Sequence, residues 1–172
     1  VITLTYVKDD EQTKNTSYTV RHVVDGEEKD TNTYTGTAWI NETNPTIVIE
    51  AGSLAQKSYT GYKFESIDTK AKEGDAIASG TVITLTYTKR TDLSYTVKYL
   101  WTDGMGSGTA IEGVQDKVVE DVTFEQEILE EPIEIPGYTP VETGKVERRM
   151  DKESLTIVFL YYKNVTLTAA SG

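Results

Sequence analysis

Apolar and polar residues alternate with a period of two in several short stretches of this chain. In residues 82–87, every second side chain is large and apolar, and most of the others are threonines. Such alternation is typical of a β-strand that buries one face. The same alternation over residues 157–161 predicts a second strand of this kind. The side chains expected to be buried are Ile83, Leu85, Tyr87, Ile157, Phe159 and Tyr161.

The alternating stretch is repeated, which indicates how the chain is organised. Residues 1–6 and 82–87 have the same sequence, Val-Ile-Thr-Leu-Thr-Tyr. Two further landmarks recur in the same order and at nearly the same spacing: a Tyr-Thr-Val segment at Tyr18 and Tyr95, and a Gly-Tyr pair at Gly61 and Gly137. Recurrence of this kind predicts two tandem copies of one small domain.

The repeats divide the chain into four parts. We expect residues 1–16 to contain the closing strand of a preceding repeat and then a polar linker that begins at residue 8. Residues 17–90 form the first repeat domain and residues 91–163 the second. Residues 164–172 are a tail or the start of a further domain. Because the linker between the copies is short, we expect an elongated monomer with the two domains end to end and few contacts between them.

Within each copy, most of the chain is predicted to be β. Asp25-Gly26 and Asp103-Gly104 are dipeptides typical of hairpin turns. Residues 46–50 form a short strand, and residues 54–59 could form one helical turn. Residues 122–129 fit both helical and strand spacing, and we favour a strand followed by an irregular turn because prolines follow closely. The predicted fold class is mostly β with minor α.

Composition supports a β-rich chain and excludes several kinds of chemistry. The 27 threonines and 11 tyrosines both favour strands. Cysteine is absent, which excludes disulfides, thiolate nucleophiles and cysteine metal sites and fits a Gram-positive surface protein. The net charge of −11 argues against binding to nucleic acid or anionic membranes. No apolar run is long enough to span a membrane.

The second copy carries the motifs of a known family. Tyr-Thr-Val-Lys-Tyr at 95–99, Ile-Pro-Gly-Tyr-Thr at 135–139 and Phe-Leu-Tyr-Tyr-Lys at 159–163 resemble the MucBP (mucin-binding-protein) repeats of Gram-positive surface proteins. The first copy matches more loosely, since Gly61 is preceded by threonine instead of proline. Both copies also resemble the wider set of β-grasp-like repeats in adhesins and internalin-type stalks. The resemblance implies two ubiquitin-like β-grasp domains outside the cell.

His22 is the only histidine, so any mechanism that needs a histidine base would have to use it. It shares a strand face with Tyr18, Val20 and Val24, and it aligns with Tyr99 of the second copy. A catalytic histidine is not expected to be a tyrosine in the sister copy. We therefore interpret His22 as the occupant of an aromatic slot in the core, and we assign no catalytic residue.

The acidic residues suggest a solvated surface more than a site. Five of them, Glu125, Glu127, Glu130, Glu131 and Glu134, form a run that is typical of a charged sheet edge. Residues 25–28 and 9–11 supply possible calcium ligands but lack EF-hand spacing, so no metal site is assigned. Residues 104–108 are rich in glycine but lack the Gly-Lys-Ser/Thr of a phosphate loop, so we interpret them as a turn and assign no cofactor.

Two tryptophans could stack on sugar rings. Trp101 lies on the Tyr95, Val97 and Tyr99 face of its strand and is expected in the core. Trp39 is the better ligand candidate, although ordinary packing is the simpler interpretation. No ligand-binding residue is assigned on this basis.

These observations predict a non-enzymatic, extracellular repeat segment that acts as a stalk or spacer in a bacterial adhesin-like protein. Wall anchoring would be through a part of the protein outside this chain, and the partners would be neighbouring repeats of the same chain. The alternative is a binding module for host glycans or mucin-type glycoproteins, which an exposed aromatic patch would favour. A hydrolase is a third possibility, and the absence of a catalytic constellation argues against it.

Overall fold

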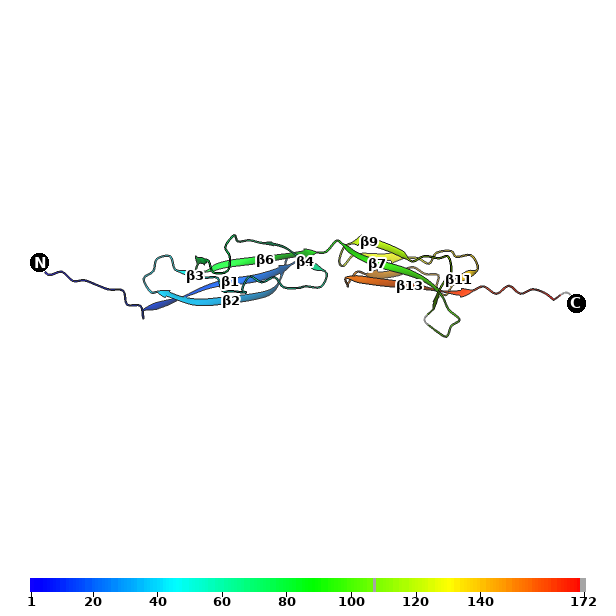
Figure 1. Ribbon diagram of the computed structural model, residues 1–172, viewed down its shortest axis with the longest axis horizontal. Coiled ribbons are helices and arrows are strands. Elements are labelled where there is room, and N and C mark those ends of the chain that lie inside the picture. The colour runs from blue at the N-terminus through cyan, green and yellow to red at the C-terminus, as the bar shows by residue number, and fades with distance from the viewer. Residues whose placement is uncertain (107, 171–172) are drawn as a thin grey trace. The chain divides into compact units, whose positions relative to one another are not determined.

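The computed structural model describes residues 1–106 and 108–170, and the chain divides into two compact units, Val1–Thr88 and Lys89–Gly172. Within the described residues all regular structure is β and there is no helix (Figure 1). The mostly β class is therefore confirmed, and the expected minor α content is wrong. None of the described segments forms a helix long and apolar enough to cross a membrane.

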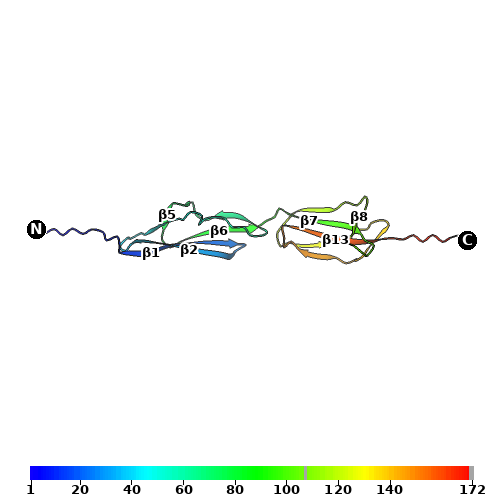
Figure 2. The same cartoon turned by 60° about the horizontal axis from the view of Figure 1, so that its bottom comes forward.

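The first unit is a mixed four-stranded sheet with a small second layer. Its strands are β1 (Thr13–Val24), β2 (Glu27–Trp39), β3 (Thr46–Val48), β4 (Tyr62–Ile67), β5 (Ala76–Ala78) and β6 (Thr81–Lys89). The sheet has the order β2-β1-β6-β4, and β1 is antiparallel to β2 and parallel to β6. Strands β3 and β5 pair in the second layer, and Figure 2 shows β5 separated from β1 and β2.

The turn between β1 and β2 is the predicted hairpin turn. Asp25 and Gly26 both have positive φ angles, 51° and 82°. Such a two-residue turn matches the right-handed twist of the strands that it joins. In the second unit, Gly104 also has a positive φ, but it lies in a longer loop because β7 ends at Trp101 and the next strand begins at Thr109. Because β7 and β8 pair antiparallel on either side of this loop, Asp103-Gly104 does lie in a hairpin connection, but not in a two-residue turn.

The core of the first unit follows the alternation in the sequence. Ile83, Leu85 and Tyr87 are at most 1% exposed, whereas Val82 on the opposite face of β6 is 49% exposed. Val20, on β1, is opposite Ile83 in the parallel register and is also buried. The predicted burial of this face of β6 is confirmed.

The second unit has the same plan with a divided second strand. Its strands are β7 (Leu93–Trp101), β8 (Thr109–Ala110), β9 (Lys117–Val122), β10 (Glu127–Glu130), β11 (Tyr138–Pro140), β12 (Val146–Arg149) and β13 (Ser154–Lys163). The sheet order is β11-β13-β7-β8, and β9 also pairs with β7. Strands β10 and β12 form the second layer. The predicted burial of Ile157, Phe159 and Tyr161 is confirmed, with exposures of 4% or less.

The two units share their central register. In the first unit Val20 is opposite Ile83 and His22 is opposite Leu85. In the second unit Val97 is opposite Ile157 and Tyr99 is opposite Phe159. His22 and Tyr99 therefore occupy equivalent positions on the first strand of each unit, as the sequence alignment indicated.

Two segments differ from the sequence-based expectations, and a third, 122–129, follows the favoured strand-and-turn interpretation in outline. Residues 54–59 form no helical turn, because Gly52 adopts a φ of 79° in a turn over 51–54 and the chain then runs irregularly to Tyr62. In 122–129, a strand ends, a turn follows and β10 begins, so the helical alternative is wrong. Strand β1 begins at Thr13, inside the expected linker, because residues 13–16 pair with the end of β2.

Candidate functional site

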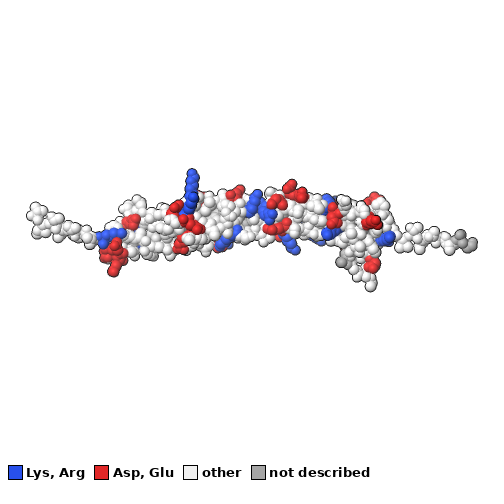
Figure 3. All heavy atoms as spheres, viewed as in Figure 1, with Lys and Arg blue, Asp and Glu red and all other residues white. Residues whose placement is uncertain are grey.

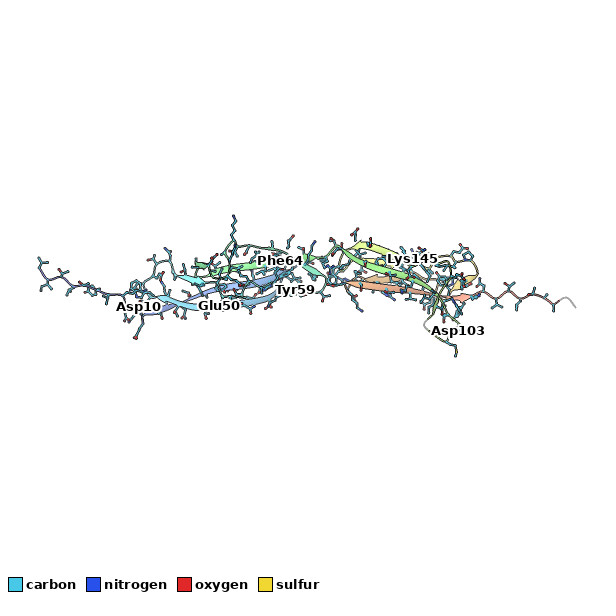
Figure 4. All side chains as sticks on the ribbon, viewed as in Figure 1. Asp10, Glu50, Tyr59, Phe64, Asp103 and Lys145 are labelled. Atoms are coloured by element: carbon cyan, nitrogen blue, oxygen red, sulfur yellow. The ribbon has the colours of Figure 1, made fainter. Side chains whose placement is uncertain are left out.

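His22 lies in the core of the first unit and is 2% exposed. Its Nδ1 is 3.0 Å from the hydroxyl oxygen of Tyr87, which also accepts a hydrogen bond from the backbone N–H of Lys57 at 2.9 Å. The imidazole stacks near the Tyr87 ring, with 5.8 Å between ring centroids, and the Tyr59 ring lies 6.5 Å away. Tyr59 and Phe64, both labelled in Figure 4, contact Tyr87 edge-on.

This environment keeps His22 uncharged. Burial lowers its pKa below the ordinary value of 6.5, and the nearby positive charge of Lys57 lowers it further. A neutral imidazole that is packed between tyrosine rings fills space and makes one hydrogen bond. These contacts fit the interpretation of His22 as the occupant of an aromatic slot.

The acidic run of the second unit is not uniformly solvated. Glu127, Glu131 and Glu134 are exposed as expected, and Lys145, labelled in Figure 4, pairs with Glu131 at 2.8 Å. Glu130 is different, because it is only 6% exposed. The interpretation of the whole run as a solvated edge is therefore wrong at this residue.

Glu130 joins three strands. Its carboxylate accepts a hydrogen bond from the Tyr95 hydroxyl of β7 at 2.5 Å. Both of its oxygens also lie within 2.9 Å of the Lys117 ammonium of β9. The second layer is thus tied to the main sheet by a buried carboxylate with two donors.

The ionisation of this cluster follows from its geometry. Burial alone would raise the pKa of Glu130, but the hydrogen bonds from Lys117 and Tyr95 outweigh it, so the pKa is lowered. Burial, followed by the hydrogen bond to Glu130, raises the pKa of Tyr95 to about 12. Tyr95 therefore stays a donor and Glu130 an acceptor at neutral pH. The cluster is a stable connection and holds no group ready to exchange a proton near pH 7.

The burial of Glu130, but not its partners, had a signal in the sequence. Ile128 and Glu130 are two residues apart, so on an extended strand they share a face. In the structure both are buried, whereas Leu129 between them is 53% exposed. The position of Lys117 was not signalled, because its pairing with Glu130 depends on how β9 and β10 pack.

The two groups of possible calcium ligands, to which no metal site was assigned, make other contacts in the structure. Asp25-Gly26 forms the β1–β2 turn, and Glu27 pairs with Lys29 at 2.6 Å. In the part of the chain that the structure describes, no group of three or more His, Asp or Glu side chains converges as metal ligands would. Figure 3 shows Lys and Arg side chains interspersed with the acids on both units.

An open hollow of about 300 Å³ in the second unit is lined by residues that include Trp101, Met105, Gly106 and Gly108. Trp101 is half-buried instead of fully packed, because it is the last inward-facing residue of β7. Trp101 is on the core-facing side of β7, as predicted. It is not fully buried there, so that part of the prediction is wrong. Ser107 of the glycine-rich loop lies outside the described residues.

Trp39 is also half-buried, at the end of β2 opposite Thr13. The Lys8 ammonium lies 5.5 Å from the centroid of its ring, a cation–π arrangement. Its indole is therefore covered on one side by a side chain of the same unit.

A groove follows the edge of β13. Strand β11 pairs only with Tyr161–Lys163, and the Val141 N–H then donates to the Leu160 carbonyl at 2.8 Å before the chain leaves the sheet. Along the remaining edge lies a hollow of about 410 Å³, lined by residues that include Val146 and Val158. An open strand edge beside apolar side chains can accept an extended peptide as an additional strand.

In the first unit, the equivalent edge is covered further. Strand β4 has six residues where β11 has three. After β4 ends, the Asp68 N–H donates to the Thr84 carbonyl at 3.1 Å, and the Asp68 carboxylate accepts the Thr84 N–H at 2.8 Å. In the second unit, proline at position 140 ends β11 early. The open groove is therefore specific to the second unit.

No protein-family model matches this chain, and no curated protein sequence matches it significantly. Among solved structures, the type 2 repeat of the mucus binding protein MUB from Lactobacillus reuteri is 16% identical, with 87% of this chain and 100% of that chain covered and a TM-score of 0.27. The minor pilin GBS52 of Streptococcus agalactiae is 9% identical, with 85% and 74% covered and a TM-score of 0.32.

Domains 3–4 of the streptococcal high identity repeats in tandem, from a cell surface protein, are 10% identical, with 86% of this chain and 98% of that chain covered and a TM-score of 0.30. Because the superpositions are loose, the function proposed below rests on the strands and residues of this chain.

Proposed function

We propose that this chain is a non-catalytic, extracellular repeat segment that acts as a stalk or spacer in an adhesin-like protein of a Gram-positive surface. Residues 17–90 and 91–163 are two tandem copies of a β-grasp-like domain without its helix. The shared strand order and register of the two units support this organisation. Neighbouring repeats of the same chain are then the immediate partners, and the wall anchor belongs to another part of the protein.

The observation that carries the proposal is the parallel pairing of the first and last long strands in each unit. In the first unit, β1 and β6 pair from Tyr18–Thr81 to Val24–Tyr87. In the second unit, β7 and β13 pair from Ser94–Ser154 to Trp101–Tyr161. Because the strands run in the same direction, the chain enters each unit at one end of its sheet and leaves at the other.

This geometry resists extension. A force applied to the two termini of a unit acts along the paired strands, so the hydrogen bonds between them are loaded together instead of one after another. A surface stalk needs this response. The neutral, packed His22 and the satisfied Glu130 cluster also support a non-catalytic role, since neither is free to act on a substrate.

Single-molecule pulling tests the proposal. The chain has no native cysteine, so attachment points can be introduced as cysteines. Lys14→Cys with Lys89→Cys places the force along β1 and β6. Glu27→Cys with Lys89→Cys places both attachments at the end of the sheet where Val24 meets Tyr87, which separates the strands one hydrogen bond at a time. We expect a much higher unfolding force for the first pair, and equal forces would overturn the stalk mechanism.

A second candidate function is the binding of a host glycoprotein or glycan. The observation that favours it is the groove along β13, which offers backbone hydrogen bonds and apolar side chains to an extended polypeptide. An array of glycans and mucin-type glycoproteins tests this function directly. Binding that Val158→Glu abolishes would favour a binding module, whereas binding that this substitution leaves unchanged would place the ligand elsewhere.

A further inference from the structure

The packing within the two units does not account for the sequence of the segment Val1–Lys8. It forms no strand, and Ile2, Leu4 and Tyr6 are 92%, 72% and 87% exposed. Its apolar side chains alternate with threonines, a pattern that needs a covering layer on one face. Neither unit supplies that layer.

The segment has a sequence counterpart whose structure is known. Residues 1–8 match residues 82–89 at every position except the seventh, where valine replaces threonine. In β6, the counterparts of Ile2, Leu4 and Tyr6 are at most 1% exposed, in a strand that lies between β1 and β4. The same side chains are thus fully buried in one copy of the sequence and exposed in the other.

Val1–Lys8 cannot close the first unit of its own chain. In the β6 position, Tyr6 would lie beside Val24, as its counterpart Tyr87 does. The chain would then have to return to Thr13, and the eleven steps of β1 from Thr13 to Val24 span about 36 Å. The seven steps from Tyr6 to Thr13 reach at most about 25 Å. The β6 position is also already filled by β6 itself.

We propose that Val1–Lys8 is the closing strand of a third repeat of this type, which precedes residue 1 in the full-length protein. The inference rests on the sequence identity with β6 and on the repeat organisation proposed above, and it does not depend on the stalk mechanism. The segment inserts between the first and fourth strands of that repeat. It is parallel to the first strand, as β6 is to β1.

The register of β6 defines the partner. Ile83 is opposite Val20, Leu85 is opposite His22, and both units have a Tyr-Thr-Val sequence on the first strand. The third repeat therefore presents a strand of the form Tyr-x-Val-x-aromatic, with Ile2 opposite its valine and Leu4 opposite its aromatic residue. Val1, Thr3 and Thr5 face outward, as Val82, Thr84 and Thr86 do.

Hydrogen exchange in the native protein, extended upstream by one repeat length, tests the proposal. We expect the amides of residues 2–6 to exchange at least about 100-fold more slowly in the extended protein than in residues 1–172 alone. Unchanged exchange in the extended protein would overturn the proposal. So would concentration-dependent dimerisation of residues 1–172 with protection of the same amides, because the segment would then bind a second copy.

A pair of substitutions locates the partner. Leu4→Asp in the extended protein is expected to lower the melting temperature of the upstream repeat and to leave both described units unchanged. Leu167→Asp is the matched control, since Leu167 is equally apolar and 92% exposed beyond β13. A loss of stability in the first unit on Leu4→Asp would contradict the proposal. Because this readout is thermal, failure here is distinguishable from failure of the pulling experiment.

Discussion

The Glu130 cluster consists of Glu130, Tyr95 and Lys117. Its geometry predicts how the stability of the second unit depends on pH. The sign of that dependence is decided by which partner is removed. Glu130→Gln keeps an amide oxygen that can still accept from the Tyr95 hydroxyl, and it frees Lys117, which is 49% exposed, to turn into water. The loss is that of charge-assisted hydrogen bonds, so we expect the second unit to lose about 1.5–3 kcal/mol of stability.

Lys117→Met removes the other partner and leaves the carboxylate buried with Tyr95 as its donor. Breaking a buried ion pair in this way costs about 3–5 kcal/mol when the remaining charge has no compensation. The exposure of Lys117 and the bond from Tyr95 place the expected loss near the lower end, about 3 kcal/mol. The lysine substitution, although nearer the surface, is therefore predicted to be the more destabilising of the two at pH 7.

The pH dependence should reverse between the native protein and this variant. In the native protein, the pKa of Glu130 is lowered from 4.5, so its stabilisation is present above pH 4.5 and is lost as pH falls through the folded value. Without Lys117, burial becomes the leading influence and raises the pKa of Glu130. The folded state then binds more protons than the unfolded state above pH 4.5, so stability falls as pH rises through that interval.

Urea denaturation of the second unit between about pH 2.5 and pH 7, followed by circular dichroism, measures both effects, because the native loss lies below pH 4.5. Glu130→Gln has no carboxyl group at this site, so its stability should show neither the native pH dependence nor the reversed one. It is therefore the control that identifies Glu130 as the titrating group. Lys98→Met removes an exposed lysine whose ammonium is 3.9 Å from Asp116, and it should change stability by less than about 1 kcal/mol. If Lys117→Met kept the native sign of pH dependence, the buried carboxylate would not be the group that governs this region.

Three further predictions concern the packing of the two units. Phe159→Ala should lower the stability of the second unit by about 3–5 kcal/mol in urea denaturation. Val158→Ala, on the half-exposed face of the same strand, should lower it by less than about 1 kcal/mol. Similar losses would mean that the assigned register of the strand is wrong. The first unit should lose thermal stability as pH falls through 6.5, because the lowered pKa of His22 makes the unfolded state bind more protons, and His22→Tyr should remove that slope. Gly108→Ala should destabilise the second unit by about 1–3 kcal/mol, since φ there is +93°, and Gly106→Ala, where added carbon meets nothing within 4 Å, should not.

The strands that close each unit could be predicted from the sequence because each carries its own signal. Alternation over 82–87 and 157–161 specifies which side chains face inward, and burial of one face is enough to make the register unique. The Asp25-Gly26 turn was equally local, since both residues tolerate positive φ. In such segments, the residues that determine the backbone conformation lie within a few positions of one another.

The sequence-based predictions were wrong where the structure of a segment depends on residues elsewhere in the chain. Residues 54–59 can form a helical turn by propensity, but Leu54 and Tyr59 pack on the core from an irregular segment instead. Glu130 looks like one acid of a solvated run until Lys117 and Tyr95 are placed beside it. The incomplete burial of Trp101 depends on where the sheet ends, and that limit is set by the loop that follows.

The early end of β11 sets apart the second unit in a way that the stalk function does not require. Pro140 cannot donate a backbone hydrogen bond, so a sheet edge that β4 protects in the first unit stays uncovered in the second. Tandem copies that are too alike risk exchanging strands with one another while they fold. Arg21 donates a hydrogen bond to Thr84, which is 63 residues later in the chain. The central sheet of each unit therefore cannot form until its last strand is present. Differences such as Pro140 and the His22–Tyr99 exchange are therefore expected to make the closing strand of one copy a poorer fit in the other copy than in its own.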